Sequence, residues 1–264
     1  MKATVFLGGG RITGALVAGL RLAKYDKPII VHDRHPTKLR QLKRQFDVIG
    51  EPNLHRAVDQ AALLIIAVRP DSVHDLLQKV GKIHRPLNLV SVAAGIPLSK
   101  LRGRLGPPVR WARAMPSPVC RTARGLTALS YDRTFSRTAK REVRRLFEKV
   151  GTVLEIPERH FDAFTVTFSS SHGYHALATL AASAVRLGLN RETALTASAH
   201  GLADGILSWR ENKIPLDQLL HEAATPGGTA AAAMKAMDSL GYAQLIQRGL
   251  QAGIAQARKN AKRS

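Results

Sequence analysis

Short apolar runs alternate with amphipathic stretches along the first half of the chain, a pattern typical of βαβ units around a parallel sheet. The run Ala62–Val68 is almost wholly apolar, as expected of a strand covered on both faces. The other predicted strands are Ala3–Leu7, Pro28–His32, Leu87–Val92, Pro107–Ala112, Leu126–Ser130 and Thr152–Ile156. The helices predicted between them are Gly14–Leu22, Pro36–Phe46, Ser72–Val80 and Arg137–Val150. This half is therefore predicted to be a doubly wound α/β domain.

After about Pro157 the apolar residues follow a helical period and alanine becomes frequent. The predicted helices are Phe161–Leu187, Arg191–Asn212, Pro215–Ala223 and Thr229–Lys262, with Gly188 and Gly227-Gly228 as helix ends or turns. We find no convincing strand, internal repeat or low-complexity linker here. The fold class is therefore predicted to be α/β, with a doubly wound domain over residues 1–157 and an all-helical domain over residues 158–264.

A glycine loop, Gly8-Gly9-Gly10, follows the first predicted strand and opens the first helix. Glycine lets backbone amides approach a pyrophosphate, and the helix N-terminus adds partial positive charge. The third position of the usual fingerprint holds Thr13, and glycine also serves plain strand-to-helix turns, so the loop alone is a weak signal. A polar strand end 20–25 residues further on supports a dinucleotide-binding domain of the Rossmann type. The contacts predicted in this loop are Gly8, Gly10, Arg11 and Ile12.

That strand end reads His32-Asp33-Arg34-His35 and carries two opposed signals. The Asp33 carboxylate is suited to the ribose hydroxyls of NAD, whereas the Arg34 guanidinium is suited to the 2′-phosphate of NADP, with Lys38 as a second charge. Asp33 is also close enough in sequence to be neutralised by its basic neighbours. We expect NADPH, with NADH as the alternative.

Positive charge is concentrated in the first half of the chain. The formal net charge is +21, and residues 1–150 hold 29 Lys and Arg against 10 Asp and Glu. The stretch from Lys100 to Lys149 is densest, with basic residues at helical spacings from Arg137 to Arg145. This pattern fits a solvated helix face, and it also fits a phosphorylated ligand, an acidic substrate or nucleic acid. Aromatic residues make up only 5% of the chain, which counts against the binding of single-stranded nucleic acid. A small-molecule substrate is expected as the partner, and nucleic acid is not.

The remaining composition indicates the compartment. Cys120 is the single cysteine, which excludes an intramolecular disulfide and suits a reducing compartment. No segment is apolar for long enough to span a bilayer, and the N-terminus does not resemble a signal peptide. We expect a cytoplasmic protein without a metal site, because no cluster of metal-ligating residues is evident.

Motifs in a fixed order then identify a family. Ala67-Val68-Arg69-Pro70 stands at the end of the third predicted strand, Ser91–Ile96 reads Ser-Val-Ala-Ala-Gly-Ile, and Arg113-Ala114-Met115-Pro116 comes next. In the helical half, Thr225–Thr229 reads Thr-Pro-Gly-Gly-Thr. Together with the glycine loop, this set resembles the pyrroline-5-carboxylate reductases nearly end to end.

The resemblance implies a reaction and an assembly. Members of that family transfer hydride from a nicotinamide to the C=N carbon of a cyclic imino acid, yielding proline, and their helices interlock with those of a second subunit. We therefore expect a homodimer formed by the C-terminal helices, with the active site between the strand ends and the helical domain. The residues implied for the cofactor are Ala67, Val68, Arg69, Pro70, Ala93 and Met115, and those for the substrate are Glu211, Thr225, Gly227 and Gly228.

Departures from the family pattern cluster at the substrate end. Ser117-Pro118-Val119 replaces the family's Asn-Thr-Pro, Ser169–His175 replaces its Ser-Gly-Ser-Gly-Pro-Ala-Tyr, and Ala230 replaces the threonine that binds the substrate carboxylate. The candidate catalytic residues are His172, Ser171 and Thr229. His172 is a candidate proton donor, with a helix-capping role as the alternative. The serines at 169–171 are candidates both for substrate contact and for N-caps.

Two other functions remain open. One is an NAD(P)-dependent dehydrogenase acting on a carbonyl compound or hydroxy acid. The other is a non-catalytic basic protein that keeps a Rossmann domain and binds nucleic acid.

Overall fold

An eight-stranded sheet forms the centre of the first part of the chain, in the order β3-β2-β1-β4-β5-β6-β7-β8. The strands are β1 (Ala3–Leu7), β2 (Ile29–His32), β3 (Ile49–Gly50), β4 (Ala61–Ile66), β5 (Leu87–Ser91), β6 (Val109–Pro116), β7 (Gly125–Tyr131) and β8 (Gly151–Glu155). Every neighbouring pair is parallel except β6 and β7. The strand order reverses direction at β1 and β4, which is where doubly wound sheets bind ligands.

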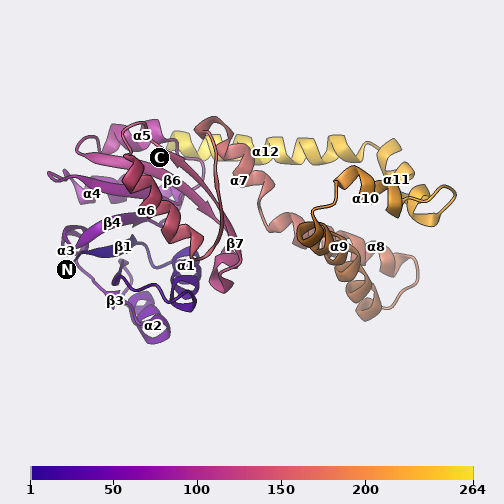
Figure 1. Cartoon of the computed structure of the whole chain (residues 1–264), viewed down its shortest axis with the longest axis horizontal. Helices are drawn as coiled ribbons and strands as arrows, with labels where there is room; N and C mark the ends of the chain where they lie inside the picture. Colours follow the sequence, from indigo (N-terminus) through magenta and orange to yellow (C-terminus); the bar gives the residue numbers. More distant parts are fainter. Residues whose placement is uncertain (1, 264) are drawn as a thin grey trace. The chain divides into compact units, whose positions relative to one another are not determined.

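Helices cover both faces of this sheet (Figure 1). On one face, α1 (Arg11–Leu22), α2 (Pro36–Phe46) and α6 (Arg137–Glu148) share a core cluster with alternate strand residues such as Phe6 and Val31. On the other face, α3 (Leu54–Asp59), α4 (Val73–Val80) and α5 (Leu98–Arg104) pack with Val5 and Leu7. Because both faces are buried, the central strands are apolar throughout. Short 3₁₀ helices, η1 (Pro70–Ser72), η2 (Pro118–Thr122) and η3 (Glu158–His160), complete this part.

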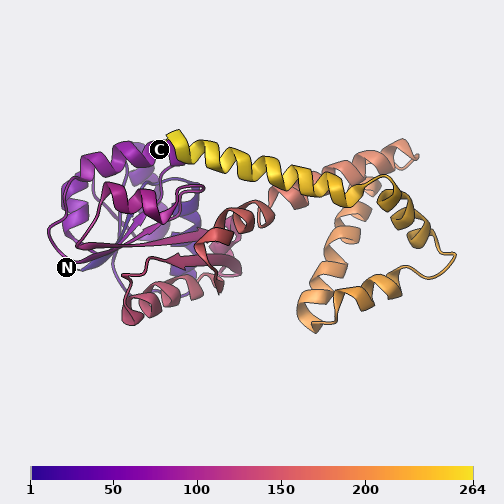
Figure 2. The ribbon, with the colours of Figure 1, turned by 90° about the horizontal axis from the view of Figure 1, so that it is seen from above.

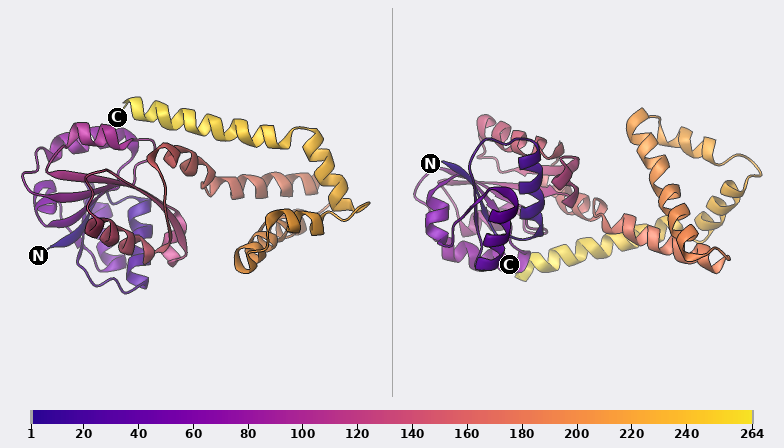
Figure 3. Two further views of the ribbon diagram at one scale, coloured as in Figure 1. Left: turned by 45° about the horizontal axis from the view of Figure 1, so that its top comes forward. Right: turned by 90° about the horizontal axis from the view of Figure 1, so that it is seen from below.

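This computed structural model describes residues 2–263, with side chains up to residue 260, and they form two compact units. The second unit, Ser169–Gln251, holds α8 (Ser171–Arg186), α9 (Arg191–Asn212), α10 (Leu216–Ala223), α11 (Thr229–Ser239) and the start of α12 (Tyr242–Arg263). Figure 3 shows this unit as helices, and its described residues include no strand. None of the helices in the described part of the chain has the length and apolar character needed to cross a membrane.

The end of α12 belongs to the first unit together with α7 (Phe161–Thr167). Ala257 is buried, and a Cβ atom on Gly95 would lie only 2.5 Å from its carbonyl oxygen. Gly95 also has a φ of +77°, so both its space and its backbone conformation require glycine. A Cβ atom on Gly253 would lie 2.9 Å from Val166 of α7. The part of α12 around Ala257 therefore packs against the loop after β5. Figure 2 shows the end of this helix, in yellow, beside the first part of the chain.

The fold class predicted from the sequence is confirmed, but several elements differ. The predicted helix Phe161–Leu187 is two helices, α7 and α8, separated at residues 168–170, where serine side chains compete for backbone hydrogen bonds. The predicted helix Thr229–Lys262 also ends early, because Gly241 takes a φ of +80° between α11 and α12. The strand predicted as Pro107–Ala112 is β6, which runs on to Pro116, so Met115 and Pro116 end the strand instead of following it. The short elements β3, α3 and α5 were not predicted.

A buried arginine joins the sheet to the segment that leads into α7. Arg113 of β6 is 2% exposed, and its Nη1 donates to Glu158 Oε1 at 2.9 Å while its Nη2 lies 3.4 Å from Asp162 Oδ1. Its guanidinium carbon lies 4.1 Å from the centre of the Phe161 ring. Glu158 Oε1 also accepts the backbone N–H of Leu98 at 3.0 Å. One carboxylate therefore fixes β6, the start of α5 and η3 together.

Loss of this arginine leaves two partly buried carboxylates without their cation. We expect Arg113→Met to lower the free energy of unfolding by about 3 kcal/mol, measured by urea denaturation with the fluorescence of the buried Trp111. The control is Arg144→Met, which removes the ion pairs with Glu148 and Glu155. These pairs are exposed, and their loss should cost less than about 1 kcal/mol. Equal losses in the two variants would contradict the bridging role of Arg113.

Candidate functional site

Four loops lie at one edge of the sheet, because the strands that precede them are parallel and aligned. Leu7 of β1 pairs with Ile66 of β4, Ile66 pairs with Ser91 of β5, and Ser91 pairs with Arg113 of β6. The loops after β1, β4 and β5 therefore start level with one another, and β6 extends past them to Pro116. The glycine loop and the three motif segments thus lie at the carboxyl edge of the sheet.

Gly8 is required by the geometry of the fold itself. Its φ is +113°, and a Cβ atom there would lie 2.5 Å from the carbonyl oxygen of Ala67. Its N–H donates to the carbonyl of His32 at 2.7 Å, and its own carbonyl accepts the hydroxyl of the buried Thr13 at 2.6 Å. Thr13, which departs from the usual fingerprint, therefore closes the loop by a side-chain hydrogen bond.

Gly10 has a different environment, because the space beside it is open. No protein atom lies within 4 Å of the position that a Cβ atom would occupy. Gly10 is the N-cap of α1, no side chain caps that helix, and its first turn contains no acidic residue. The first backbone N–H groups of α1, which include those of Arg11 and Ile12, thus remain available for an anion. This geometry fits the pyrophosphate of a dinucleotide.

The carboxylate of Asp33 is occupied by backbone donors. Its Oδ2 accepts the N–H of Gly9 and its Oδ1 accepts the N–H of His35, both at 2.8 Å, and Lys38 Nζ lies 3.6 Å from Oδ2. Burial raises the pKa of this carboxyl, but the two hydrogen bonds and the charge of Lys38 outweigh burial and lower the pKa below its ordinary value of 3.8. Asp33 therefore stabilises the folded protein fully at pH values above its ordinary pKa of 3.8. This stabilisation is lost as the pH falls through the lower pKa that the carboxyl has in the folded protein. Asp33 joins the glycine loop to the end of β2.

The basic side chains beside Asp33 face the solvent. Arg34 is exposed, and its Nε donates to the neighbouring His35 at 3.2 Å. The side chain of Lys38 is 47% exposed. With Asp33 turned toward the backbone, the polar groups that this strand end offers to a ligand are cationic, which suits a 2′-phosphate.

The other predicted cofactor residues belong to the same edge of the sheet. Ala67 and Ala93 are buried, and Val68 and Met115 are partly buried. Arg69 is 81% exposed and lies 3.9 Å from Asp71, and Pro70 begins η1. The structure thus gathers the predicted cofactor residues, from Gly8 to Met115, in one unit.

The predicted substrate residues all lie in the second unit, on several elements. Ser171 and His172 form the exposed first turn of α8, where Ser169 Oγ lies 2.6 Å from Ser171 Oγ. Ser170 takes the N-cap position without a capping hydrogen bond from its own side chain, but Ser169 Oγ accepts the backbone N–H of Ser171 at 3.4 Å. Glu211 is exposed near the end of α9.

The segment from Thr225 to Gly228 forms a tight turn before α11. The N–H of Gly228 donates to the carbonyl of Thr225 at 2.9 Å, and Gly227 has a φ of +77° after Pro226, as in a type II turn. Gly228 caps α11 without a side-chain hydrogen bond, and Thr229 is the first helical residue. This turn therefore presents exposed backbone and hydroxyl groups at a helix N-terminus.

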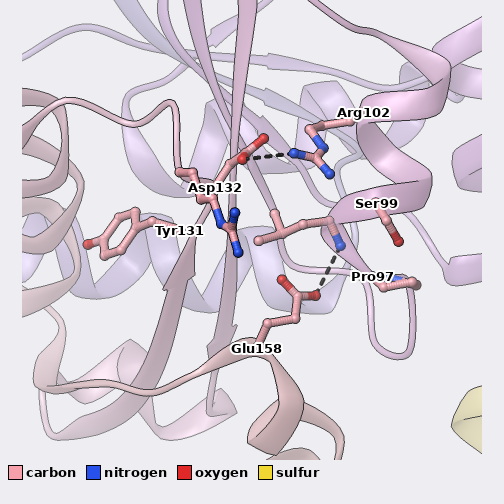
Figure 4. Close-up of a pocket in the computed structure, with 8 residues that line it drawn as sticks. Pro97, Ser99, Arg102, Tyr131, Asp132 and Glu158 are labelled. Atoms are coloured by element: carbon pink, nitrogen blue, oxygen red, sulfur yellow. Dashed lines mark hydrogen bonds and ion pairs between the residues drawn. The ribbon is translucent and has the colours of Figure 1, made fainter.

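A separate hollow of about 500 Å³ lies in the first unit near the Arg113 cluster (Figure 4). Arg102 and Asp132 form an ion pair of 3.2 Å at its wall, next to Glu158. None of its lining residues is a predicted site residue. Within the described part of the chain, no three His, Cys, Asp or Glu side chains gather as metal ligands.

Comparisons with known proteins agree with this geometry. Residues 158–260 match the family model for pyrroline-5-carboxylate reductase dimerisation, and residues 4–95 match the model for coenzyme F420-dependent NADP oxidoreductases. A pyrroline-5-carboxylate reductase of Mycobacterium leprae is 29% identical over 96% of this chain and 94% of its own length. That of Thermus thermophilus is 32% identical over 89% of each chain. The chain belongs to the pyrroline-5-carboxylate reductase family.

The solved structures of this family have the same fold. The pyrroline carboxylate reductase of Plasmodium falciparum, solved with NADP bound, superposes with a TM-score of 0.85 at 19% identity, covering 98% of each chain. Sequence reasoning missed the roles of Gly9 and Thr13 in shaping the glycine loop of this family member. A buried carboxylate directly after an apolar strand is the signal that could have revealed the contact with Gly9.

Gly10 provides a direct test of the pyrophosphate site. Gly10 has a φ of −81°, which valine also adopts, and no protein atom obstructs a side chain there. Gly10→Val should therefore fold normally but lose measurable NADPH binding in a fluorescence titration, because the side chain fills the anion's space. Gly8→Ala is the contrasting variant, and it should lower the melting temperature. Unchanged NADPH affinity in folded Gly10→Val would refute this placement.

Arg34 and Asp33 separate cofactor choice from loop geometry. Arg34→Ala should raise the Kd for NADPH about tenfold to a hundredfold and leave NADH nearly unchanged, because it removes a charge-assisted contact. Asp33→Asn should weaken NADPH and NADH by similar factors, since it loosens a loop that both cofactors use. Arg40→Ala, on an exposed turn of α2, serves as the control. Selective loss of NADH in Asp33→Asn would instead assign Asp33 to the ribose.

Proposed function

We propose that this protein is an NADPH-dependent reductase that acts on the C=N bond of pyrroline-5-carboxylate or a related cyclic imine. The observation that carries the proposal is the open, uncapped start of α1 at Gly10, flanked by the cationic strand end of Arg34 and Lys38, in a member of this family. Proline formation is the corresponding cellular role.

NADPH supplies the hydride, and the protein's task is to bind and orient the reactants. In this proposal the N–H groups at the start of α1 hold the pyrophosphate, while Arg34 and Lys38 hold the 2′-phosphate. The loops that contain Ala67–Pro70, Ala93 and Met115 surround the nicotinamide. Hydride transfer needs mainly this positioning from the protein, and these residues provide it.

The helical unit supplies the substrate contacts in this proposal. The turn from Thr225 to Thr229 offers backbone N–H groups and hydroxyls at the start of α11, where a carboxylate is favoured by the helix dipole. Glu211 contributes a further polar contact, while His172 or Ser171 delivers the proton to the imine nitrogen. Ala230 lacks the hydroxyl that the family uses, so the natural substrate is either pyrroline-5-carboxylate held by fewer contacts or an imine of different shape.

A homodimer built by the helical unit is part of the proposal. Large hydrophobic side chains are exposed along its helices, including Leu180, Val185, Ile206, Leu207, Trp209, Leu245 and Ile246. Such a surface needs a partner, and residues 158–260 match the dimerisation model of the family. We accordingly assign nucleotide binding to residues 1–157, and substrate binding and dimerisation to residues 158–264.

A cytoplasmic location completes the proposal. Its support is the single cysteine, Cys120, which is buried and free. Burial raises the pKa of its thiol to about 12, so the thiolate that would form disulfides is scarce at neutral pH.

The reaction is tested by NADPH oxidation against cyclic imines and 2-oxo acids in parallel. We expect turnover of a cyclic imine, with pyrroline-5-carboxylate among the substrates. Ala230→Thr should lower the KM for pyrroline-5-carboxylate about tenfold, because a hydroxyl is restored to its carboxylate; His172→Gly should help by enlarging the pocket. Ala232→Thr places the same hydroxyl on another face of α11 and should change nothing.

Two outcomes would contradict the proposal. Turnover of 2-oxo acids alone would replace it with a carbonyl dehydrogenase. Failure of both Ala230→Thr and His172→Gly to improve pyrroline-5-carboxylate reduction, in folded protein that reduces some other imine, would exclude the proline assignment and keep the cofactor assignment.

A further inference from the structure

Charge is divided unequally between the two helical layers of the first unit. Helices α1, α2 and α6, which cover one face of the sheet, carry 11 Lys and Arg against 2 Asp and Glu. Helices α3, α4 and α5, on the opposite face, carry 5 against 2. Of the charged groups on these helices, the proposed reductase function uses Lys38 and the first turn of α1, so it leaves most of this charge unexplained.

The basic residues of α6 differ in whether they are paired. Arg144 is neutralised by Glu148 at 2.6 Å and Glu155 at 3.2 Å, and Lys140 lies over the Tyr131 ring at 5.2 Å. Arg137, Arg141 and Arg145 are exposed and form no hydrogen bond or ion pair with any residue that the structure describes. These three are four positions apart, so they form one stripe about 12 Å long on the helix surface.

A second group of unpaired cations lies on α2, on the same face of the sheet. Arg40, Lys43 and Arg44 are exposed, and within the described chain they too make no polar contact. Helix α1 lies between α2 and α6 in Figure 1, and all three share one core cluster. We call these six residues, Arg40, Lys43, Arg44, Arg137, Arg141 and Arg145, the basic face.

Repulsion among these like charges destabilises the folded protein, so stability does not explain them. Free guanidinium groups, by contrast, bind phosphate oxygens through paired hydrogen bonds. A stripe of them matches a polymer with regularly repeated phosphates better than it matches a single small anion.

The side chains exposed on α2 and α6 indicate which kind of polyanion the basic face fits: a membrane surface, a single-stranded nucleic acid or a duplex. No large hydrophobic side chain is exposed on α2 or α6 among the described residues, whereas helices that lie on membranes insert an apolar face. Exposed aromatic rings, which stack on the bases of single strands, are also missing from these two helices in the described chain. A duplex keeps its bases stacked inside and presents only phosphates and grooves.

We propose that the basic face binds the phosphate backbone of double-stranded nucleic acid without sequence preference. The low aromatic content, which disfavours single strands, does not oppose this binding mode. The nucleotide site and the duplex use different residues, so reductase activity and duplex binding are separable by mutation.

The test is fluorescence anisotropy of a labelled duplex of about 20 base pairs with the full-length protein, from about 50 to about 200 mM salt. We expect binding whose log K falls linearly with log salt. The triple variant Arg137→Gln, Arg141→Gln, Arg145→Gln should weaken binding at least about tenfold, and it should flatten the slope by about 0.9 for each phosphate that the protein no longer neutralises. Glutamine keeps the helix propensity of these positions.

The matched control is Arg56→Gln, Lys79→Gln, Arg104→Gln, which removes the same charge from exposed positions on the opposite face. It should leave duplex affinity within about threefold, and both triple variants should oxidise NADPH at the wild-type rate with a substrate imine. Equal weakening in the two triple variants would show diffuse attraction and overturn the proposal. It would also fall if the duplex did not bind at about 50 mM salt, or if vesicles of anionic lipid bound while the duplex did not.

Discussion

The carboxylate of Asp33 determines the form of the nucleotide end of this protein. It accepts backbone N–H groups from Gly9 and His35, which belong to loops after different strands. Without it, two buried or half-buried donors lose their acceptor, and the glycine loop is free to move away from the end of β2. With it in place, the loop turns so that Gly10 and the first turn of α1 face open space, while the cations Arg34 and Lys38 beside it are exposed. At this position an acidic residue would ordinarily indicate NAD. Because Asp33 instead accepts the backbone N–H groups of Gly9 and His35, it is compatible with NADPH.

Sequence reasoning succeeded where one physical rule dominates. The central strands are apolar because both faces are covered, so β1, β2, β4 and β5 were evident, as was the glycine loop between β1 and α1. It failed where a side chain contacts a residue distant in sequence, or contacts a backbone group that the sequence does not single out. The contacts of Asp33 are to N–H groups that every residue except proline possesses, and Arg113 finds Glu158 45 residues later. Apolar periodicity continues through residues 168–170 and Leu240–Gly241, so a serine cluster and one left-handed glycine, rather than a change of pattern, end those helices.

The two units are under different constraints. In the first unit many side chains are buried in the two core clusters, so a change of size there disturbs the packing. Even Gly8 has no room for a methyl group. In the second, Ala194 and Ser198 are the buried residues identified on its helices, and most other positions are exposed in the single chain. The departures from the family pattern at His172 and Ala230 lie on such exposed turns. Substitutions at these two positions therefore cost folding little, whereas a side chain at Gly8 does not fit.

The return of α12 to the first unit makes that unit discontinuous in sequence. The loop at Gly95 is covered by Ala257, and Val166 by Gly253, so this unit includes residues that are synthesised after the whole of the second unit. A nascent chain that has completed all eight strands still lacks the helix that packs on the loop after β5. The N-terminal part of most chains can fold as a unit during translation. Here the nucleotide-binding unit can reach its final packing only after the ribosome has also made residues 169–251, which belong to the second unit, so the loop at Gly95 stays uncovered until α12 has emerged.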